Sequence, residues 1–457
     1  MNYLIKNADS IYVNQSLAQQ TIVKDIRIRD GIICEIGQDL VPTSSDPETI
    51  IDAKHCVVYP GFVNTHHHLA QSILKGVPEG LNKGLGDWLA AVPYRFWPKI
   101  PAELMYLAAK LGFYELIRSG TTTCADHHYL YHANVSKQIE QAVWQAAEDV
   151  GIRFALCRGS ATSTGNHKGM KSLNLQPESL DCVMTRMTDT IKRHHDSSPF
   201  SMKRLCVAPT SLIHSSSKNE LIALADFARR HQLKMHSHLL EVGFDEQQAQ
   251  QKHGLSAVDY AESCNWLGED VWFAHLVKAD EQAIQTLAQS KTGISHCPTS
   301  NCRLGSGIAP AHQMDNAGML VSLGVDGSAS AESGSMLQEL NLAWLLQRSQ
   351  HGAESLSVEK VIKWGSENGA KILGLQTGQI KVGYAADIVL YRIDDLRVNT
   401  VHDRRLSPVI CGEPMNVHFS FINGKLIIDR GEFTSIDTMA LSRDLQKQMK
   451  CFLTTID

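Results

Sequence analysis

The chain of 457 residues is 43% hydrophobic and 20% charged, which is typical of a globular protein with one large barrel domain and a minor domain. Its formal net charge of −5 and its lack of long Lys/Arg runs argue against a nucleic-acid surface and favour a small, uncharged or anionic substrate. No apolar run approaches the roughly 18 residues of a membrane span, and the scattered cysteines suit free thiols, so we expect a cytoplasmic protein without a membrane partner.

The two ends of the chain share a β-rich pattern. Residues 1–59 contain short β-type runs, such as YLIKNA, DIRIRDG and HCVVYP, separated by turns. Residues 381–457 repeat this style with GYAADIVLYRID and VHFSFINGKLIID, the second of which contains an Asn-Gly turn. Because isolated strands cannot bury their apolar faces, we expect the two ends to form one small β-sandwich domain.

Residues 60–380 follow a different pattern, in which apolar runs alternate with amphipathic helical stretches. GTTTCADHHY precedes the helix SKQIEQAVWQAAEDVG, for example, and RLCVAPT, LKMHSHLLE, VWFAHLV and LVSLGVDGS are later strand candidates. The number of such units is about eight, which closes a (β/α)8 TIM-type barrel. We therefore predict an α/β protein whose catalytic barrel spans residues 60–380, with active-site residues at the carboxyl ends of its strands.

A triple histidine ends the first predicted barrel strand, in VVYPGFVNTHHH. His66 and His68 are two residues apart, so on an extended chain both side chains lie on one face while His67 lies on the other. Two imidazoles on one face at a strand end can bind a single metal ion. The alternative is a surface histidine cluster that binds nothing.

Two later strands end in further histidines. In LKMHSHLLEV, His238 can act as a ligand and Glu241 as a proton carrier, although His236 shares the face of His238 and competes for the ligand role. An exposed helix start is the alternative for this segment. In VWFAHLV, His275 follows an apolar run, where a hydrogen-bonded core histidine is the alternative to a functional one.

Asp326 follows the apolar strand of LVSLGVDGSAS. An unpaired buried carboxylate would be costly there, which favours a metal-binding or proton-transfer role. Three imidazoles and one carboxylate suit Zn²⁺, or Fe²⁺ as the alternative, better than Mg²⁺ or Ca²⁺. The segment KRLCVAPT offers no strand-end lysine to bridge a second ion, so the sequence predicts one divalent ion.

Five segments carry a resemblance to a known family: PGFVNTHHHLAQSILKG, MHSHLLE, FAHLV, HCPTSNCRLGSGIAP and SLGVDGSAS. Over nearly the whole chain they resemble the amidohydrolase superfamily, in its branch of aminoheterocycle deaminases and triazine hydrolases. Within this branch the chain is most similar to 8-oxoguanine and isoxanthopterin deaminases. The segments HHHLAQSILKG and VPYRF resemble either both deaminase groups or the pterin group, whereas NCRLGSGIAP resembles the oxoguanine group.

The resemblance implies a set of four metal ligands, namely His66, His68, His238 and Asp326. It also implies that Glu241 is the proton shuttle and that His275 orients the attacking water, which Asp326 helps to deprotonate. The implied reaction is hydrolytic deamination of a bicyclic oxo-aminoheterocycle with release of ammonia. The substrate would be 8-oxoguanine, which gives urate, or isoxanthopterin, which gives its deaminated lumazine.

Substrate contacts are expected from Gln71, Trp88 and Arg158. A flat aminopurine or pterin could stack on Trp88 while Gln71 and Arg158 pair with its amide and carbonyl edges. The alternatives are a core role for Trp88 and a structural ion pair for Arg158. His127 and His128 also end a predicted strand, and either reach the pocket or pack against neighbours.

Other functions stay open at this point. A triazine chlorohydrolase or aminohydrolase would use a similar scaffold, as would a guanine- or adenosine-type deaminase or a cyclic amide hydrolase. A non-catalytic assembly protein of the same fold is the remote alternative, and such proteins typically lack ligands that this chain retains. A homo-oligomer is equally compatible with the sequence.

Overall fold

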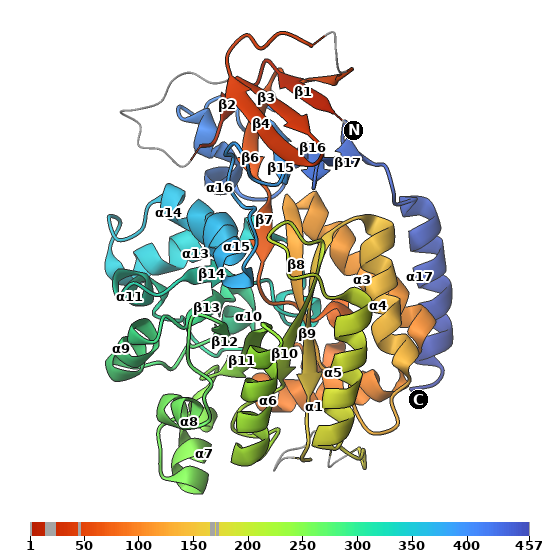
Figure 1. Ribbon diagram of the computed structural model, residues 1–457, viewed down its shortest axis with the longest axis vertical. Coiled ribbons are helices and arrows are strands. Elements are labelled where there is room, and N and C mark those ends of the chain that lie inside the picture. The colour runs from red at the N-terminus through yellow and green to blue at the C-terminus, as the bar shows by residue number, and fades with distance from the viewer. Residues whose placement is uncertain (1, 14–23, 44–46, 165–169, 171–172, 457) are drawn as a thin grey trace.

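The computed structural model describes residues 2–13, 24–43, 47–164, 170 and 173–456, and its centre is a parallel β-barrel (Figure 1). Neighbouring barrel strands are all parallel and follow one another in chain order. They are β7 (Phe62–Asn64), β8 (Thr121–His128), β9 (Arg153–Ser160), β10 (Lys203–Pro209), β11 (Lys234–Leu239), β12 (Val271–His275), β13 (Gly293–His296) and β14 (Val321–Leu323). Thr65 N donates to Leu323 O at 3.1 Å and Asp326 N donates to His66 O at 3.0 Å, which joins the last strand to the first.

Helices surround the barrel, in the segments between its strands and after the last of them. They are α1 (Leu85–Ala91), α2 (Pro93–Phe96), α3 (Ala102–Arg118), α4 (Lys137–Val150), α5 (Leu180–His194), α6 (Lys218–Arg230), α7 (Gly243–His253), α8 (Ala257–Ser263), α9 (Glu281–Gln289), α10 (Pro298–Arg303), α11 (Ala311–Asn316), α12 (Ser328–Ala331), α13 (Met336–His351), α14 (Val358–Lys363) and α15 (Gly369–Leu373). In α6, Ser217 and Glu220 form a capping box at the start, and Leu221, Leu224 and Ala228 bury one face. No helix within the described ranges is long and apolar enough to cross a membrane.

The strands of the two chain ends form two further sheets, which lie at the top of Figure 1. One has the order β4 (Ile32–Gly37), β3 (Asp25–Arg29), β1 (Tyr3–Lys6), β5 (Thr49–Asp52), and the other has the order β18 (Glu432–Phe433), β17 (Lys425–Asp429), β16 (Asn416–Ile422), β15 (Ile388–Arg392), β6 (Cys56–Pro60), β2 (Ser10–Ile11). The two sheets share an apolar core, in which Tyr3 and Phe421 pack edge to face with ring centroids 5.1 Å apart. The predicted barrel with a small β domain from both chain ends is confirmed. The domain limits of 1–59, 60–380 and 381–457 stay a prediction.

The carboxyl end also contains helices, which its β-rich pattern does not predict. α16 (Ser407–Cys411) is short, whereas α17 (Thr438–Leu453) is long and packs along α3 on the side of the barrel (Figure 1). Leu441, Leu445, Met449 and Phe452 recur every three or four residues of α17 and pack against the core. This amphipathic period attaches the end of the chain to the barrel.

A buried ion pair joins the start of β9 to the small domain. Arg153 donates through Nε and Nη2 to the two carboxylate oxygens of Asp387 at 3.0 and 3.1 Å. Asp387 precedes β15 and also accepts from Thr377 Oγ1 and Asn423 N, both at 2.6 Å. The small domain therefore lies at the amino ends of the barrel strands, opposite their carboxyl ends (Figure 1).

Candidate metal centre and active site

The carboxyl ends of three barrel strands bring four polar side chains together. His66 and His68 follow β7, His238 lies in β11, and Asp326 follows β14. His68 Nε2 lies 3.2 Å from His238 Nε2, and Asp326 Oδ1 lies 3.3 Å from both His66 Nε2 and His68 Nε2. The four residues that the family resemblance implies as ligands are thus direct neighbours.

Backbone carbonyls determine which imidazole nitrogens carry a proton. His68 Nδ1 lies 2.7 Å from His127 O, and His238 Nδ1 lies 2.8 Å from Thr210 O. Because a carbonyl oxygen can only accept, we assign a proton to each Nδ1 and a lone pair to each Nε2. Two lone pairs that face each other at 3.2 Å cannot form a hydrogen bond, but both can bind one cation.

His236 precedes His238 by two residues in β11, so it lies deeper in the barrel, and it forms a hydrogen bond with His66. Its Nδ1 is 2.9 Å from Trp272 O, so this nitrogen is the donor, and its Nε2 accepts from His66 Nδ1 at 2.8 Å. The remaining lone pair of His66 is therefore also at Nε2. Since both nitrogens of His236 are engaged, the geometry favours His238 over His236 as a metal ligand.

Three ligand-atom pairs in this cluster have separations suited to holding a metal ion, and His66, His68 and Asp326 form one group that could do so. With metal–ligand bonds of about 2.0–2.1 Å, tetrahedral ligand atoms are roughly 3.3 Å apart, which matches the separations of 3.2 and 3.3 Å found here. Burial lowers the pKa values of His66 and His238 well below the usual range, so both rings are neutral and able to bind. Among the described residues, His66 Nε2 has no hydrogen-bond partner, as expected of an atom that faces an ion.

Glu241 and His275 lie beside this cluster. Glu241 Oε2 is 3.5 Å from His275 Nε2, and Glu241 Oε1 accepts from Ser306 Oγ at 3.4 Å. Burial raises the pKa of Glu241 to about 7, although the neighbouring His275 opposes this shift. A carboxyl group with a pKa near neutrality can both give and take a proton at physiological pH, which suits a proton shuttle.

Two of the site residues have an uncommon backbone conformation. The φ angles of His275 and Asp326 are 75° and 58°, in the left-handed region that non-glycine residues rarely adopt. Such conformations persist only where surrounding contacts hold them, and they gather at functional sites. The backbone at these two residues is therefore held by its surroundings.

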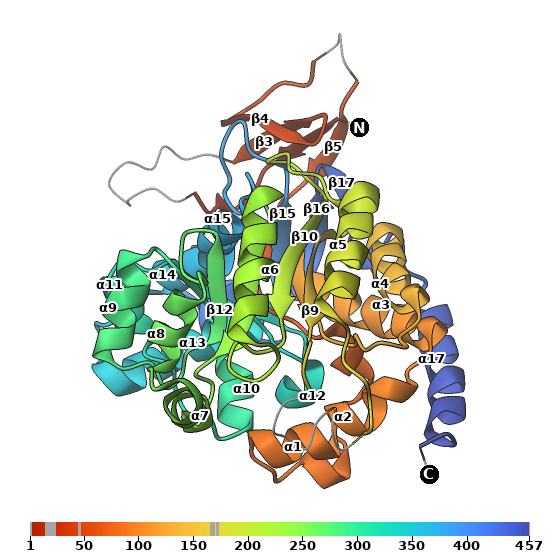
Figure 2. The ribbon, with the colours of Figure 1, turned by 60° about the horizontal axis from the view of Figure 1, so that its bottom comes forward.

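A cavity of about 560 Å³ opens onto these groups, and its size falls in the range of about 300–1,000 Å³ that is typical of small-molecule sites. Its lining includes His68, His238, Glu241, His275 and Asp326 from the centre, together with Gln71, Trp88, Tyr94 and Tyr129. α1 and α2, at the bottom of Figure 2, lie across this end of the barrel. Gln71 Nε2 donates to Tyr129 Oη at 3.3 Å, so the cavity wall has both aromatic and amide surfaces.

Arg158 does not reach this cavity, which corrects the expectation that it contacts the substrate. Its Nη1 and Nη2 atoms donate to the two carboxylate oxygens of Glu178, both at 2.8 Å, and its guanidinium lies 3.8 Å from the ring centroid of Tyr131. Both charged side chains are fully buried. A buried guanidinium requires a charge partner, and Glu178 satisfies that requirement within the structure. The structural ion pair is therefore the correct alternative.

His127 and His128 pack against their neighbours and do not line the cavity. His127 Nε2 donates to Ala208 O at 3.1 Å, and its ring centroid lies 4.6 Å from that of His238. His128 packs against Tyr131 with centroids 5.2 Å apart. Successive residues of a strand point to opposite faces, which explains their different directions.

Tyr129, Ser300 and Asn301 also belong to the site, although sequence reasoning does not identify them. Ser300 Oγ donates to Asp326 Oδ2 at 2.5 Å, and Asn301 Oδ1 accepts from His275 Nδ1 at 2.9 Å. Both residues lie in HCPTSN, a segment that carries the family resemblance, and Tyr129 directly follows the two histidines of β8. These positions, beside segments already singled out in the sequence, are the signals by which the three residues could have been found.

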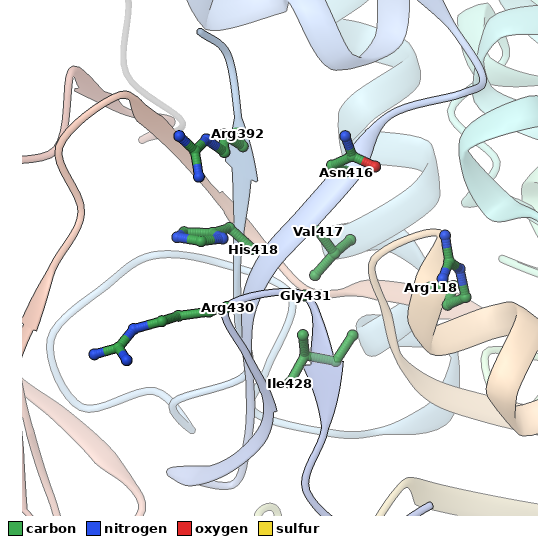
Figure 3. A pocket seen from close by; sticks show the side chains of 8 residues that line it. All are labelled: Arg118, Arg392, Asn416, Val417, His418, Ile428, Arg430 and Gly431. Atoms are coloured by element: carbon green, nitrogen blue, oxygen red, sulfur yellow. The ribbon is translucent and has the colours of Figure 1, made fainter. Parts of the chain in front are cut away.

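A second hollow lies on the small domain, where Arg118, Arg392 and Arg430 contribute to its lining. Figure 3 shows that Arg392 and Arg430 lie on one side of the strands while Arg118 lies on the other. Arg392 also forms hydrogen bonds of 2.6 and 2.7 Å with Asp394. The positive charges do not converge, so the candidate active site is the cavity at the barrel.

Comparison with known proteins finds similarity over most of the chain. The sequence profile described as "Amidohydrolase family" matches residues 57–427. Isoxanthopterin deaminase from an unknown prokaryotic organism is 42% identical over 442 residues, which cover 93% of this chain and 91% of that protein. 8-Oxoguanine deaminase from Pseudomonas aeruginosa is 34% identical over 389 residues, which cover 84% of this chain and 85% of that protein.

Two solved structures have the same fold. An amidohydrolase from an environmental sample of the Sargasso Sea superposes with a TM-score of 0.84 at 37% identity, and 100% of each chain is covered. Atrazine chlorohydrolase from Arthrobacter aurescens TC1, complexed with zinc, superposes with a TM-score of 0.90 at 25% identity over 97% of this chain and 99% of that one. The similarity thus extends over both the barrel and the strands of the chain ends.

Proposed function

This chain belongs to the amidohydrolase family, whose members act on carbon–nitrogen bonds, and we propose that it is a metal-dependent deaminase of isoxanthopterin or 8-oxoguanine. The placement of Glu241 carries this proposal. Its carboxyl group, with a pKa of about 7, lies in the wall of the cavity beside the histidine cluster. A group that can protonate a ring nitrogen and then an amine is what hydrolytic deamination requires.

The proposed ligands are His66, His68, His238 and Asp326, which would hold one Zn²⁺, or Fe²⁺ as the alternative. Such an ion, when bound, lowers the pKa of a coordinated water and polarises the bond under attack. The chain's own residues hold these ligands in place: carbonyl oxygens fix the Nδ1 protons of His68 and His238, and His236 fixes that of His66. Zinc in the structurally similar atrazine chlorohydrolase supports the choice of ion.

Proton transfer is assigned to Glu241, with His275 and Asp326 orienting the attacking water and helping to remove its proton. Glu241 would protonate the ring nitrogen next to the amino carbon, take up a proton that originates from the attacking water, and pass it to the amino group, which leaves as ammonia. Its contacts with His275 and Ser306 keep the carboxyl group in the cavity wall. The net reaction replaces an amino group by an oxo group.

Substrate recognition is assigned to the aromatic and amide groups of the cavity wall. A flat bicyclic ring would stack on Trp88, while Gln71 would pair with its lactam edge. Isoxanthopterin is the first substrate to test, because the pterin deaminase has the higher identity and coverage of the two relatives. The molecule that the enzyme binds would thus be a small aminoheterocycle. We expect the enzyme to act in the cytoplasm.

The test is turnover of a substrate panel by the metal-loaded enzyme. Isoxanthopterin, 8-oxoguanine, pterin, guanine, adenosine and a chlorinated triazine are compared by release of ammonia and of chloride. We expect the highest kcat/KM for one of the first two, because relatives that match most of this chain are named for these substrates. A hydrogen bond lost with the oxo group would cost about 1–3 kcal/mol, or roughly tenfold to a hundredfold. A higher value for guanine or adenosine would contradict the substrate assignment, and chloride release would favour a chlorohydrolase.

A further inference from the structure

The short helix α10 contacts two residues of the candidate active site directly. α10 contributes no side chain to the cavity lining, yet Ser300 Oγ donates to Asp326 Oδ2 at 2.5 Å and Asn301 Oδ1 lies 2.9 Å from His275 Nδ1. Ser300 and Asn301 are themselves fully buried. Two consecutive residues therefore reach one site group that follows β14 and another that ends β12.

We propose that Ser300 and Asn301 are positioning residues with separate tasks, an inference that rests on the proposed function. Ser300 turns Oδ1 of Asp326 toward the metal ligands, and Asn301 turns Nε2 of His275 toward the reacting water. Ser300 should thus govern metal binding, whereas Asn301 should govern turnover.

The two oxygens of the Asp326 carboxylate have different surroundings. Oδ2 accepts from Ser300 Oγ and also lies 3.3 Å from Ser330 Oγ. Oδ1 faces the Nε2 atoms of His66 and His68, both at 3.3 Å. Hydroxyl donors on one oxygen leave the other available as a metal ligand. The two serine contacts therefore hold the carboxylate in this orientation.

Asn301 holds the ring of His275 in one orientation. The amide oxygen accepts from Nδ1–H, so Nε2 is the nitrogen that faces Glu241 Oε2, at a distance of 3.5 Å. Without this acceptor, the ring can rotate or exchange its tautomer, and Nε2 would no longer be reliably available to a water. His275 also has a left-handed backbone, with φ of 75°, a conformation that persists only where surrounding contacts hold it.

The helix itself is anchored independently of the two side chains. Thr299 N donates to Glu339 Oε2 on α13 at 3.0 Å, and Asn301 N donates to Cys297 O at 3.0 Å. Both bonds start from backbone atoms, so side-chain substitutions leave them intact. Cys302, the next residue on α10, is exposed and offers a matched control.

The experiment compares Ser300→Ala, Asn301→Ala and the control Cys302→Ala, together with the conservative variants Ser300→Thr and Asn301→Asp. Zinc affinity is measured by chelator competition without substrate. The kcat and KM values are measured on the panel compound with the highest kcat/KM. Selective ¹⁵N-histidine NMR reports whether the Nδ1–H of His275 is retained, and melting temperature reports stability.

We expect Ser300→Ala to weaken zinc affinity about 10–100-fold, the range typical of groups that support metal ligands, and Ser300→Thr to restore most of it. Asn301→Ala should keep zinc affinity within about threefold but lower kcat by roughly 10–100-fold at similar KM, with loss of the His275 Nδ1–H signal. Asn301→Asp should recover that signal, because its carboxylate still accepts. Cys302→Ala should behave like the wild type in every measurement.

Two results would overturn the inference. Equal losses of zinc affinity in Ser300→Ala and Asn301→Ala, in parallel with melting temperature, would mean that both residues only pack the helix. Failure of Ser300→Thr to restore zinc affinity would remove the role of the hydroxyl donor. Zinc affinity and the NMR signal are measured without turnover, so they test the inference even if no panel compound is deaminated. The absence of deamination would contradict the proposed function alone.

Discussion

Glu241 is the residue to which proton transfer is assigned in the proposed reaction. We expect Glu241→Gln to keep the metal and lose kcat by several orders of magnitude, because Gln preserves the shape but cannot transfer the proton. Zinc content by elemental analysis and ammonia release check the two halves of this prediction. The exposed Glu269, changed to Gln, is the control. If Glu241→Gln lost the metal, its carboxylate would be a ligand and the assigned mechanism would be wrong.

His238 and Asp326 are expected to be essential for metal binding. His238→Ala or Asp326→Ala should remove most bound ion and all measurable activity while the barrel still folds, because each change removes one of the converging donor atoms. Elemental analysis and circular dichroism of the purified variants check this. The control is His402→Ala, which removes an exposed imidazole. Full metal content in both site variants would contradict the ligand assignment.

Glu339 should make stability depend on pH. Burial raises its pKa to about 8, whereas an unfolded chain has a value of about 4.3. Between these values the unfolded chain releases the proton and the folded protein keeps it, so the free energy of unfolding should fall with rising pH, by up to about 1.4 kcal/mol per pH unit. Between pH 5 and pH 8 the melting temperature of the wild type should fall relative to that of Glu339→Gln. Parallel curves for the two proteins would contradict this prediction.

At the scale of elements, α1 forms a wall of the cavity through Trp88, whose side chain is buried. Loss of an aromatic stacking surface costs about 0.5–1.5 kcal/mol beyond the lost burial, so Trp88→Ala should raise KM by roughly tenfold with little change in zinc content. Trp88→Phe should retain much of the affinity. The exposed Leu81, changed to Ala, tests whether any change in this region has the same effect. An unchanged KM in Trp88→Ala would exclude the stacking role.

At the scale of the whole molecule, the Arg153–Asp387 pair couples the barrel to the small domain at the end remote from the cavity. Arg153→Ala leaves the Asp387 carboxylate buried without its charge partner, which should cost about 3–5 kcal/mol of stability. Melting temperature should therefore fall clearly, while KM at 25 °C stays the same. Lys291→Ala breaks an exposed pair with Glu269 and should leave the melting temperature unchanged. A stable Arg153→Ala variant would mean that the pair does not couple the two parts.

The sequence by itself determined the class of fold and the strand-end positions of the polar residues. Alternating strand and helix patterns are local properties, as are the Gly and Asn-Gly turns, so the barrel and the small β domain could be predicted. The position of His66, His68, His238, His275 and Asp326 after apolar runs is also visible in the sequence. The family profile and the relatives agree with that prediction at the level of family.

Only the tertiary structure decided which side chains meet. Spacing places His236 and His238 on the same face of β11, but depth in the barrel separates them, because the deeper ring is already bonded to Trp272 O and His66. Arg158 likewise follows an apolar run, yet Glu178, twenty positions later, satisfies its charge inside the protein. A one-dimensional pattern specifies the face of a strand and not the partner that arrives from a distant segment. For that reason the contacts of Ser300 with Asp326 and of Asn301 with His275 became visible only in the tertiary structure.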